Sequence, residues 1–193
     1  VIDGTSDDLK GLINFVRGED YFDYDGDCNL TETRTNPLGD VYHSQLVVVG
    51  QPSAETSFVS TNQEAYFRNT NGYDNFAQDN EQRKEVIYAG SNSGILHAFD
   101  AKTGKELWGF VPPLIAPNLP NIMNQSLNQS KGGTNALFGV DGSPVAHDAF
   151  IFGLEADGKT YQTQKSWRTL LFVPYGRGGA GFSVLDVTNP TLT

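Results

Sequence analysis

Short apolar runs, each closed by glycine or a polar turn, recur along this chain and predict β-strands. Residues 86–90, 95–100 and 106–111 are three such runs, and the turns SNSG and AKTG join them. Connections this short favour an antiparallel meander, because parallel strands need a long crossover. A longer β-branched run bounded by glycines, at residues 39–50, predicts an earlier strand that is buried on both faces.

The same order of runs begins again in the second half of the chain. Residues 140–153, 167–176 and 181–190 resemble the first three strands, and Asp186 stands to its strand as Asp100 does to its own. A repeated four-stranded unit with long connections is typical of a β-propeller, although a sandwich or two stacked meanders would fit the same runs. Propellers close with about four to eight blades. We therefore expect an all-β propeller fragment of a longer polypeptide, with one complete four-stranded blade and most of a second.

One amphipathic helix is predicted near the start of the chain, between Ser6, which can cap it, and Gly18, which can end it. Residues 51–85 are polar and have no clear period, so we expect a long connection with a short helix or hairpin near NQEAYFRN. The expected buried stripe of the first helix is Leu9, Leu12, Ile13 and Val16. The whole chain is then part of a single propeller domain with four parts: a helix and acidic lead-in at 1–38, a first blade at 39–114 that includes the insertion, a connection at 115–139 and an incomplete second blade at 140–193.

The composition narrows the range of functions. The chain has 193 residues, 38% of them hydrophobic, and a formal net charge of −10, as expected for a folded protein that repels phosphate backbones and anionic lipids. No run approaches the roughly 18 apolar residues of a membrane-spanning helix. We therefore expect no nucleic-acid partner and no direct membrane insertion. Cys28 is the only cysteine, so it cannot form a disulfide within the chain.

The stretch DYDGDCNLTE, residues 23–32, is the strongest candidate for chemistry. Asp23, Asp25 and Asp27 match the opening of an EF-hand loop, in which alternate carboxylates converge on a calcium ion. The match then fails, because the sixth position holds Cys28 in place of glycine and the twelfth holds Arg34 in place of a bidentate glutamate. We expect either a variant Ca²⁺ loop or a solvated acidic turn with Arg34 as the local counter-charge. The ligands of the variant loop would be Asp23, Asp25, Asp27 and Glu32, with Asn29 as a further candidate.

Two other patterns favour structural interpretations. The glycines of GRGGAG, residues 176–181, have nearly the spacing of a dinucleotide fingerprint, but they join two predicted strands and open no helix. We expect a wide hairpin or bulge there. The histidines His43, His97 and His147 are too scattered to indicate a metal site, and His97 lies within a predicted strand as an interior residue. No catalytic constellation is predicted.

A motif in the first blade links the chain to a known superfamily. Ala98, Asp100, Thr103, Gly104 and Trp108 read A-x-D-x-x-T-G-x-x-x-W, which resembles the tryptophan-docking motif of quinoprotein-like propellers. Asp100 and Thr103 can bond the backbone of the turn, Gly104 can adopt a left-handed conformation, and Trp108 can wedge against the neighbouring blade. These roles are structural and indicate no particular chemistry.

The order of several segments gives a narrower resemblance. From Ile13 to Pro190, the chain is similar to the C-terminal propeller of the PilC/PilY family, the tip-associated adhesin and assembly proteins of bacterial type IV pili. The segments that carry this resemblance are NFVRGED, DGDCNLTETR, LGDVYHSQLVVVG, VIYAGSNSGILHAFDAKTGKELWGFVPP, FGVDGSPVAHDAFI and WRTLLFVPYGRGGAGFSVLDVTNP. Variable stretches near residues 51–85 and 115–135 interrupt it.

The resemblance implies a non-enzymatic role. Family members are exported through the periplasm to the pilus tip or outer membrane, where they support pilus assembly against retraction and contribute to adhesion, with calcium in a propeller loop as a modulator. Implied partners are minor pilins at the pilus tip, surface or host-cell ligands, and the remainder of the parent propeller. The family's own calcium loop is expected beyond Thr193, so it is not carried over.

Two other functions stay open on the same scaffold. A quinone-cofactor dehydrogenase of the pyrroloquinoline quinone type commonly uses a vicinal cysteine pair, whereas this chain has one cysteine. A periplasmic scaffold that resembles the propeller lipoprotein of the outer-membrane assembly machine would have shorter and more regular blades. The long insertions of this chain instead favour function in surface loops at a rim.

Overall fold

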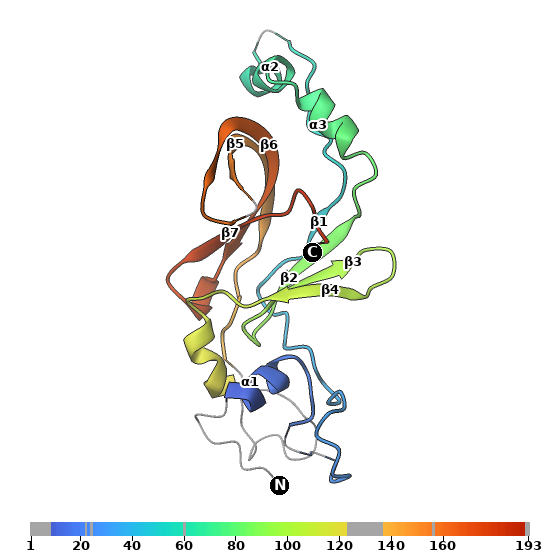
Figure 1. The fold of residues 1–193 in the computed structure, drawn as a ribbon, viewed down its shortest axis with the longest axis vertical. Helices are drawn as coiled ribbons and strands as arrows, with labels where there is room; N and C mark the ends of the chain where they lie inside the picture. Colours follow the sequence, from blue (N-terminus) through green and yellow to red (C-terminus); the bar gives the residue numbers. More distant parts are fainter. Residues whose placement is uncertain are drawn as a thin grey trace.

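The computed structural model describes residues 9–21, 23, 25–59, 61–122, 137–155 and 157–191. Two antiparallel sheets dominate this part of the chain (Figure 1). One sheet has four strands in the order β1-β2-β3-β4, and the other has three strands in the order β5-β6-β7. Within the described residues, one sheet of four strands and one of three confirm the expected complete blade and incomplete second blade.

The first sheet is the predicted meander. Its strands pair antiparallel, and three of them lie within one residue of their predicted bounds. A one-residue bulge follows Ala98, because Ala98 pairs with Trp108 while Phe99 pairs with Glu106. The strands are β1 (Val47–Val49), β2 (Val86–Gly90), β3 (Leu96–Asp100) and β4 (Glu106–Phe110).

The strand expected at residues 39–50 is much shorter than predicted. Only Val47–Val49 form it, and β1 pairs with β2 alone, at the edge of the sheet. Val49 faces the core, whereas Val48 is 54% exposed. The prediction of burial on both faces is therefore wrong, because a β-branched run shows strand propensity but does not show how many neighbours cover the strand.

The second sheet repeats the first with longer strands. β5 and β6 form a hairpin that extends beyond the short β7, as an arm above the body of the sheet (Figure 1). The bounds are β5 (Val145–Leu154), β6 (Tyr161–Pro174) and β7 (Phe182–Asp186). β6 begins six residues before its predicted start, because the polar segment 161–166 pairs with β5 although it lacks an apolar period.

The hydrophobic core lies between the two sheets. Inward-facing side chains of both sheets form one cluster, as expected for two blades packed face to face. Its buried members are Val49, Val86, Tyr88, Leu96, Ala98, Val140, Leu171, Val173 and Val187. Each sheet leaves its other face partly exposed, for example at Val48 on the first sheet and Val184 on the second.

The first helix exists, but it buries another face than predicted. α1 (Leu9–Val16) buries Gly11 and Phe15, whereas Leu9 and Ile13 of the predicted stripe are 67% and 46% exposed. The ring of Tyr21 occupies the space that a side chain at Gly11 would need, and Phe15 packs with Tyr21 and Ile122. These contacts with residues outside the helix determine which face of α1 is buried. The predicted cap, Ser6, lies outside the described residues, and Gly18 follows the helix with a φ of +96°.

The insertion between β1 and β2 folds into two short helices. Of the short helix or hairpin expected near NQEAYFRN, the structure has the helix, α2 (Gln63–Thr70), while α3 (Tyr73–Asp79) was not predicted. Two 3₁₀ segments, η1 (Ala116–Ile122) and η2 (Gly176–Gly178), complete the described elements. Among the described residues, no helix combines the length and apolar character needed to cross a membrane. The boundaries of the four predicted parts of the chain stay predictions.

Candidate functional site

The acidic stretch forms a loop whose ends are held together by the backbone. A bridge pairs Glu19 with Thr33, and next to it Asp20 N–H donates to Glu32 O over 2.8 Å. Arg34 N–H donates to Gly18 O over 2.9 Å. Residues 20–32 therefore form a closed acidic loop between α1 and the first sheet.

Within this acidic loop, the structure brings together the predicted carboxylates. Ligand atoms of Asp23, Asp25 and Asp27 all lie within 4.8 Å of one another. A second group with the same spacing joins Asp25 to Glu32 and to Asp20, which is 4% exposed. Asp20 was missed because it precedes the D-x-D-x-D pattern, and only its position at the base of the closed loop brings it near Glu32. Asp25 belongs to both groups.

The backbone of the acidic loop turns at the position where an EF-hand has glycine. Cys28 has a φ of +69°, and its N–H donates to Asp23 Oδ1 over 3.1 Å. Asn29 N–H donates to Asp27 Oδ1 over 2.7 Å, and the Asn29 side chain donates to Glu32 Oε2 over 3.3 Å. A left-handed residue is thus present at the sixth position although it carries a side chain in a conformation that favours glycine.

The electrostatics of the acidic loop favour a cation. The negative charge of Asp27 above all, with Asp25 and Asp20 adding to it, raises the pKa of Glu32 above its ordinary value. Arg34, the local counter-charge of the alternative interpretation, is only 3% exposed; its guanidinium lies 4.2 Å from the centroid of the Phe15 ring and donates to Pro37 O. Its role as a counter-charge stays a prediction. Clustered carboxylate oxygens fit Ca²⁺.

The tryptophan-docking motif forms the turn after β3. Asp100 Oδ1 accepts N–H bonds from Lys102 (2.9 Å) and Thr103 (3.0 Å), and Asp100 Oδ2 lies 2.7 Å from Lys84 Nζ. The hydrogen bond from Lys84 and these N–H groups lower the pKa of Asp100 to about 2. Gly104 has a φ of +70° and donates its N–H to Asp100 O.

Trp108 joins the two sheets. Its indole N–H donates to Pro190 O over 2.8 Å, and its ring packs on the buried ring of Tyr88. Ala98, the cross-strand partner of Trp108, is fully buried. In the described residues, the indole thus contacts the exit of the second sheet.

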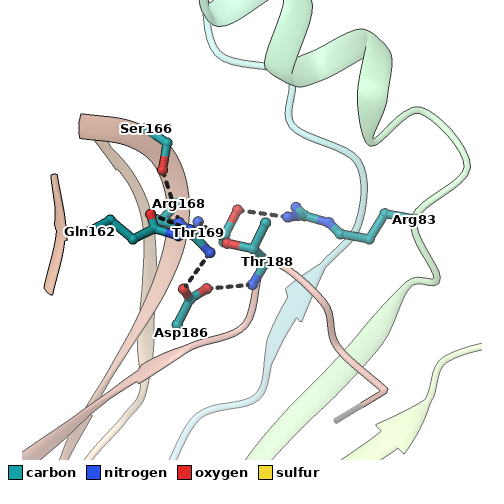
Figure 2. Close-up of polar contacts among 7 residues, drawn as sticks. All are labelled: Arg83, Gln162, Ser166, Arg168, Thr169, Asp186 and Thr188. Atoms are coloured by element: carbon teal, nitrogen blue, oxygen red, sulfur yellow. Dashed lines mark hydrogen bonds and ion pairs between the residues drawn. The ribbon is translucent and has the colours of Figure 1, made fainter. Parts of the chain in front are cut away.

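A second polar link between the sheets had no signal in the sequence. Arg83 donates through Nη1 to Thr169 Oγ1 over 2.6 Å (Figure 2). It also donates through Nε and Nη2 to Gly50 O. Thr169 in turn donates to Asp148 Oδ1 over 2.6 Å, and Asp148 Oδ2 accepts from Tyr73 OH over 2.5 Å. Burial lowers the pKa of Arg83, and burial together with the bond to Asp148 raises that of Tyr73 to about 12.

The turn after β7 repeats the chemistry of the turn after β3. Asp186 Oδ1 accepts from Thr188 N–H over 3.0 Å, and Asp186 Oδ2 lies 3.3 Å from Arg168 Nη1 (Figure 2). Arg168 therefore forms the ion pair with Asp186 that Lys84 forms with Asp100. Ser166 and Gln162 hold the guanidinium of Arg168 from its other side. The repeated pair supports the predicted equivalence of the two aspartates.

The histidines and the glycine-rich stretch have structural contacts. His97 is buried; it donates through Nδ1 to Glu106 Oε1 over 2.6 Å, and its Nε2 lies 3.1 Å from Ser91 Oγ. His43 Nδ1 donates to the buried carboxylate of Asp141 over 2.8 Å. Among the described residues, neither of the two groups with metal-ligand spacing contains a histidine. Residues 176–181 connect β6 to β7 through η2, as a strand connection and not as a helix start.

Comparisons with known proteins agree on one family. The family model described as "PilY1 beta-propeller domain" matches residues 38–191. The chain is 34% identical over 179 residues to "Type IV pilus biogenesis factor PilY1 homolog" of Xylella fastidiosa, which covers 93% of this chain and 13% of that protein. It is 34% identical over 185 residues to "Type IV pilus biogenesis factor PilY1" of Pseudomonas aeruginosa strain UCBPP-PA14, which covers 95% of this chain and 14% of that protein.

One solved structure is similar as well. The crystal structure of the Pseudomonas aeruginosa PilY1 C-terminal domain has a TM-score of 0.49 and 28% sequence identity, and the similarity covers 75% of this chain and 23% of that one. The chain thus spans only a small part of each protein that it matches.

Proposed function

Because the chain belongs to the PilY1 beta-propeller family, we propose that it is a propeller segment of a type IV pilus biogenesis factor. The observation that carries the proposal is the similarity of 93 to 95% of this chain to proteins named for that function. Those proteins are much longer, since the chain spans 13 to 14% of them. The segment therefore contributes one part of their activity.

The segment acts by binding and not by catalysis. It supports pilus assembly against retraction and contributes to surface attachment. Its buried and half-buried titratable side chains support this proposal, because their described contacts hold the fold: buried His97 bonds Glu106, and half-buried Asp148 bonds Tyr73 and Thr169. Such groups stabilise the interior through their hydrogen bonds.

The acidic loop binds Ca²⁺ and so modulates this role. Asp23, Asp25 and Asp27 would hold the ion, with Glu32 as a further ligand and Asp20 beside it. Within each of the two carboxylate groups the oxygens lie within 4.8 Å of one another, and this spacing and the raised pKa of Glu32 support the proposal, because a bound cation would relieve the repulsion. When bound, the ion supplies charge neutralisation and pins the entry to the first sheet.

The proposed location follows from the proposed role. The protein is exported through the periplasm to the cell surface, at the pilus tip or the outer membrane. Its partners there are minor pilins of the tip, ligands on surfaces or host cells, and the remaining blades of its own propeller. The printed names of the relatives support the pilus association alone.

A deletion tests the proposed role in assembly. The segment for residues 38–191 is removed from the parent gene, and surface pilin is measured after shearing, together with twitching motility. We expect both to fall to background, and we expect pilin to return when the retraction motor is also inactivated, because the segment counters retraction. Normal pili in the deletion strain would contradict the proposal.

A further inference from the structure

The insertion between β1 and β2 carries an exposed apolar surface outside both sheets. Phe58 and Tyr66 bring the loop before α2 and the helix together, with ring centroids 4.9 Å apart. Exposed apolar residues on the sheet faces differ, because neighbouring blades cover such faces in a closed propeller. Apolar surface on an insertion instead marks a binding site. The members of this α2 surface, with exposed fractions between 49% and 68%, are Phe58, Val59, Tyr66 and Phe67.

A pocket opens beside Phe67, between α2 and the arm of β5 and β6. It has a volume of about 350 Å³, and three aromatic rings line it: Phe67, Phe150 and Trp167. Trp167 is fixed, because its indole N–H donates to Asn71 O over 2.9 Å and the ring of Tyr73 packs edge-on against it. A preformed aromatic pocket next to an exposed apolar patch is suited to one apolar anchor side chain of a partner.

The surroundings of the α2 surface are acidic. Residues 51–80 contain four carboxylates and a single basic side chain, Arg68. Arg68 pairs with Glu64 Oε2 over 2.9 Å and donates to Glu55 O over 3.2 Å, so one carboxylate is balanced and residues 51–80 keep three carboxylates in excess. The side chain of Glu64 is 77% exposed at the rim of the pocket. Charge complementarity therefore selects a basic partner.

We propose that the α2 surface binds a basic amphipathic segment of a partner protein, with one apolar side chain in the pocket beside Phe67 and lysine or arginine side chains near Glu64. In protein interfaces, aromatic anchors usually supply the affinity and a charged rim supplies the specificity. The inference does not depend on the proposed role in pilus assembly. Peptide binding at the α2 surface can be absent while the role in pilus assembly holds, and it can be present while that role is refuted.

Two synthetic peptides test this surface. One is an amphipathic Leu/Lys peptide, the other is its Leu/Glu counterpart, and fluorescence anisotropy measures their binding to the 193-residue chain. We expect the lysine peptide to bind at least about tenfold more tightly, with an affinity that falls as salt rises. Phe67→Ser should weaken its binding about tenfold, and Glu64→Lys should do so by several fold.

The controls separate this surface from other apolar surfaces. Phe182→Ser changes a 64% exposed side chain on β7 and should leave binding unchanged. If Phe67→Ser fails to fold, Phe58→Ser in the loop before α2 takes its place. Equal binding of both peptides, or loss of binding in Phe182→Ser alone, would overturn the proposal. A neutral oligosaccharide that displaces the lysine peptide would overturn the choice of a protein partner.

Discussion

Two of the turns that aspartates organise in this chain differ in how each carboxylate is balanced. In the turn after β3, Asp100 accepts two backbone N–H bonds and pairs with Lys84, so its pKa falls to about 2. In the acidic loop, carboxylates lie near one another, and their repulsion raises the pKa of Glu32. Asp100 in the first turn has Lys84 as its counter-charge, whereas the acidic loop holds several carboxylates close together.

The difference separates a structural turn from a responsive one. A turn whose carboxylate is balanced by other groups of the chain stabilises the fold without a bound ion. Substitutions that remove its contacts should therefore lower the free energy of unfolding. A turn with unbalanced charge should respond to whatever cation or proton the solution supplies. Four predictions test this contrast, from the largest expected effect to the smallest.

Trp108 tests the structural turn most severely. Trp108→Ala removes the ring that joins the sheets and should lower the free energy of unfolding by about 3–4 kcal/mol. Trp108→Phe keeps an aromatic ring but loses the bond to Pro190 O, so it should lower this free energy by about 1–2 kcal/mol. Urea denaturation measures both. A loss below about 1 kcal/mol for the alanine variant would contradict the docking role.

Calcium tests the responsive turn. Calcium at about one hundred times its dissociation constant should raise the free energy of unfolding by about 2.7 kcal/mol, and a chelator should reverse the gain. Asp25→Asn should abolish the effect, because Asp25 belongs to both carboxylate groups. Asp79→Asn, on α3, is the matched control and should keep it. Calorimetric titration measures the binding, and the absence of heat with the unmodified chain would refute a calcium site.

Opposite substitutions at two left-handed positions should have opposite signs. Cys28→Gly in the acidic loop removes a side chain at a φ of +69° and should stabilise the chain by about 0.5–1 kcal/mol. Gly104→Ala after β3 adds a side chain at a φ of +70° in open space and should destabilise it by about 1 kcal/mol through backbone strain alone. Thermal unfolding compares the two variants. Equal signs would show that φ does not control these turns.

Acid should affect the two turns in opposite directions. Because the pKa of Asp100 is lowered to about 2, its stabilisation is complete above its ordinary pKa of 3.8 and is lost as the pH falls through about 2. Because the pKa of Glu32 is raised, its destabilisation is present at neutral pH and disappears as the pH falls through that raised value and below 4.5. Glu32→Gln should therefore stabilise the chain at pH 7 but not at pH 3, as urea midpoints at both pH values would show. A gain that is independent of pH would exclude charge repulsion.

The sequence predicted the elements that local patterns determine. Strands β2, β3 and β4 were located within one residue, because short turns and alternating apolar residues set their limits. The turn of the docking motif could be read from the sequence for the same reason, since its bonds lie within Asp100 and the four residues after it.

Features that depend on distant partners could not be predicted. The buried face of α1 is chosen by Tyr21 and Ile122, and no helical period shows this. The bond between Arg83 and Thr169 joins residues 86 positions apart and follows no motif. In the acidic loop, the aspartates were found by their spacing, whereas Asp20 was found only from the closure of the loop.

The contact of Trp108 with Pro190 also sets an order of folding events. The meander of β2, β3 and β4 needs only short loop closures, whereas this contact spans 82 residues. Contacts between distant residues form late, because the entropy of closing a long loop must be overcome before they stabilise the chain. We therefore expect the meander of β2, β3 and β4 to form before the second sheet docks onto it, with the contact of the indole as a late step.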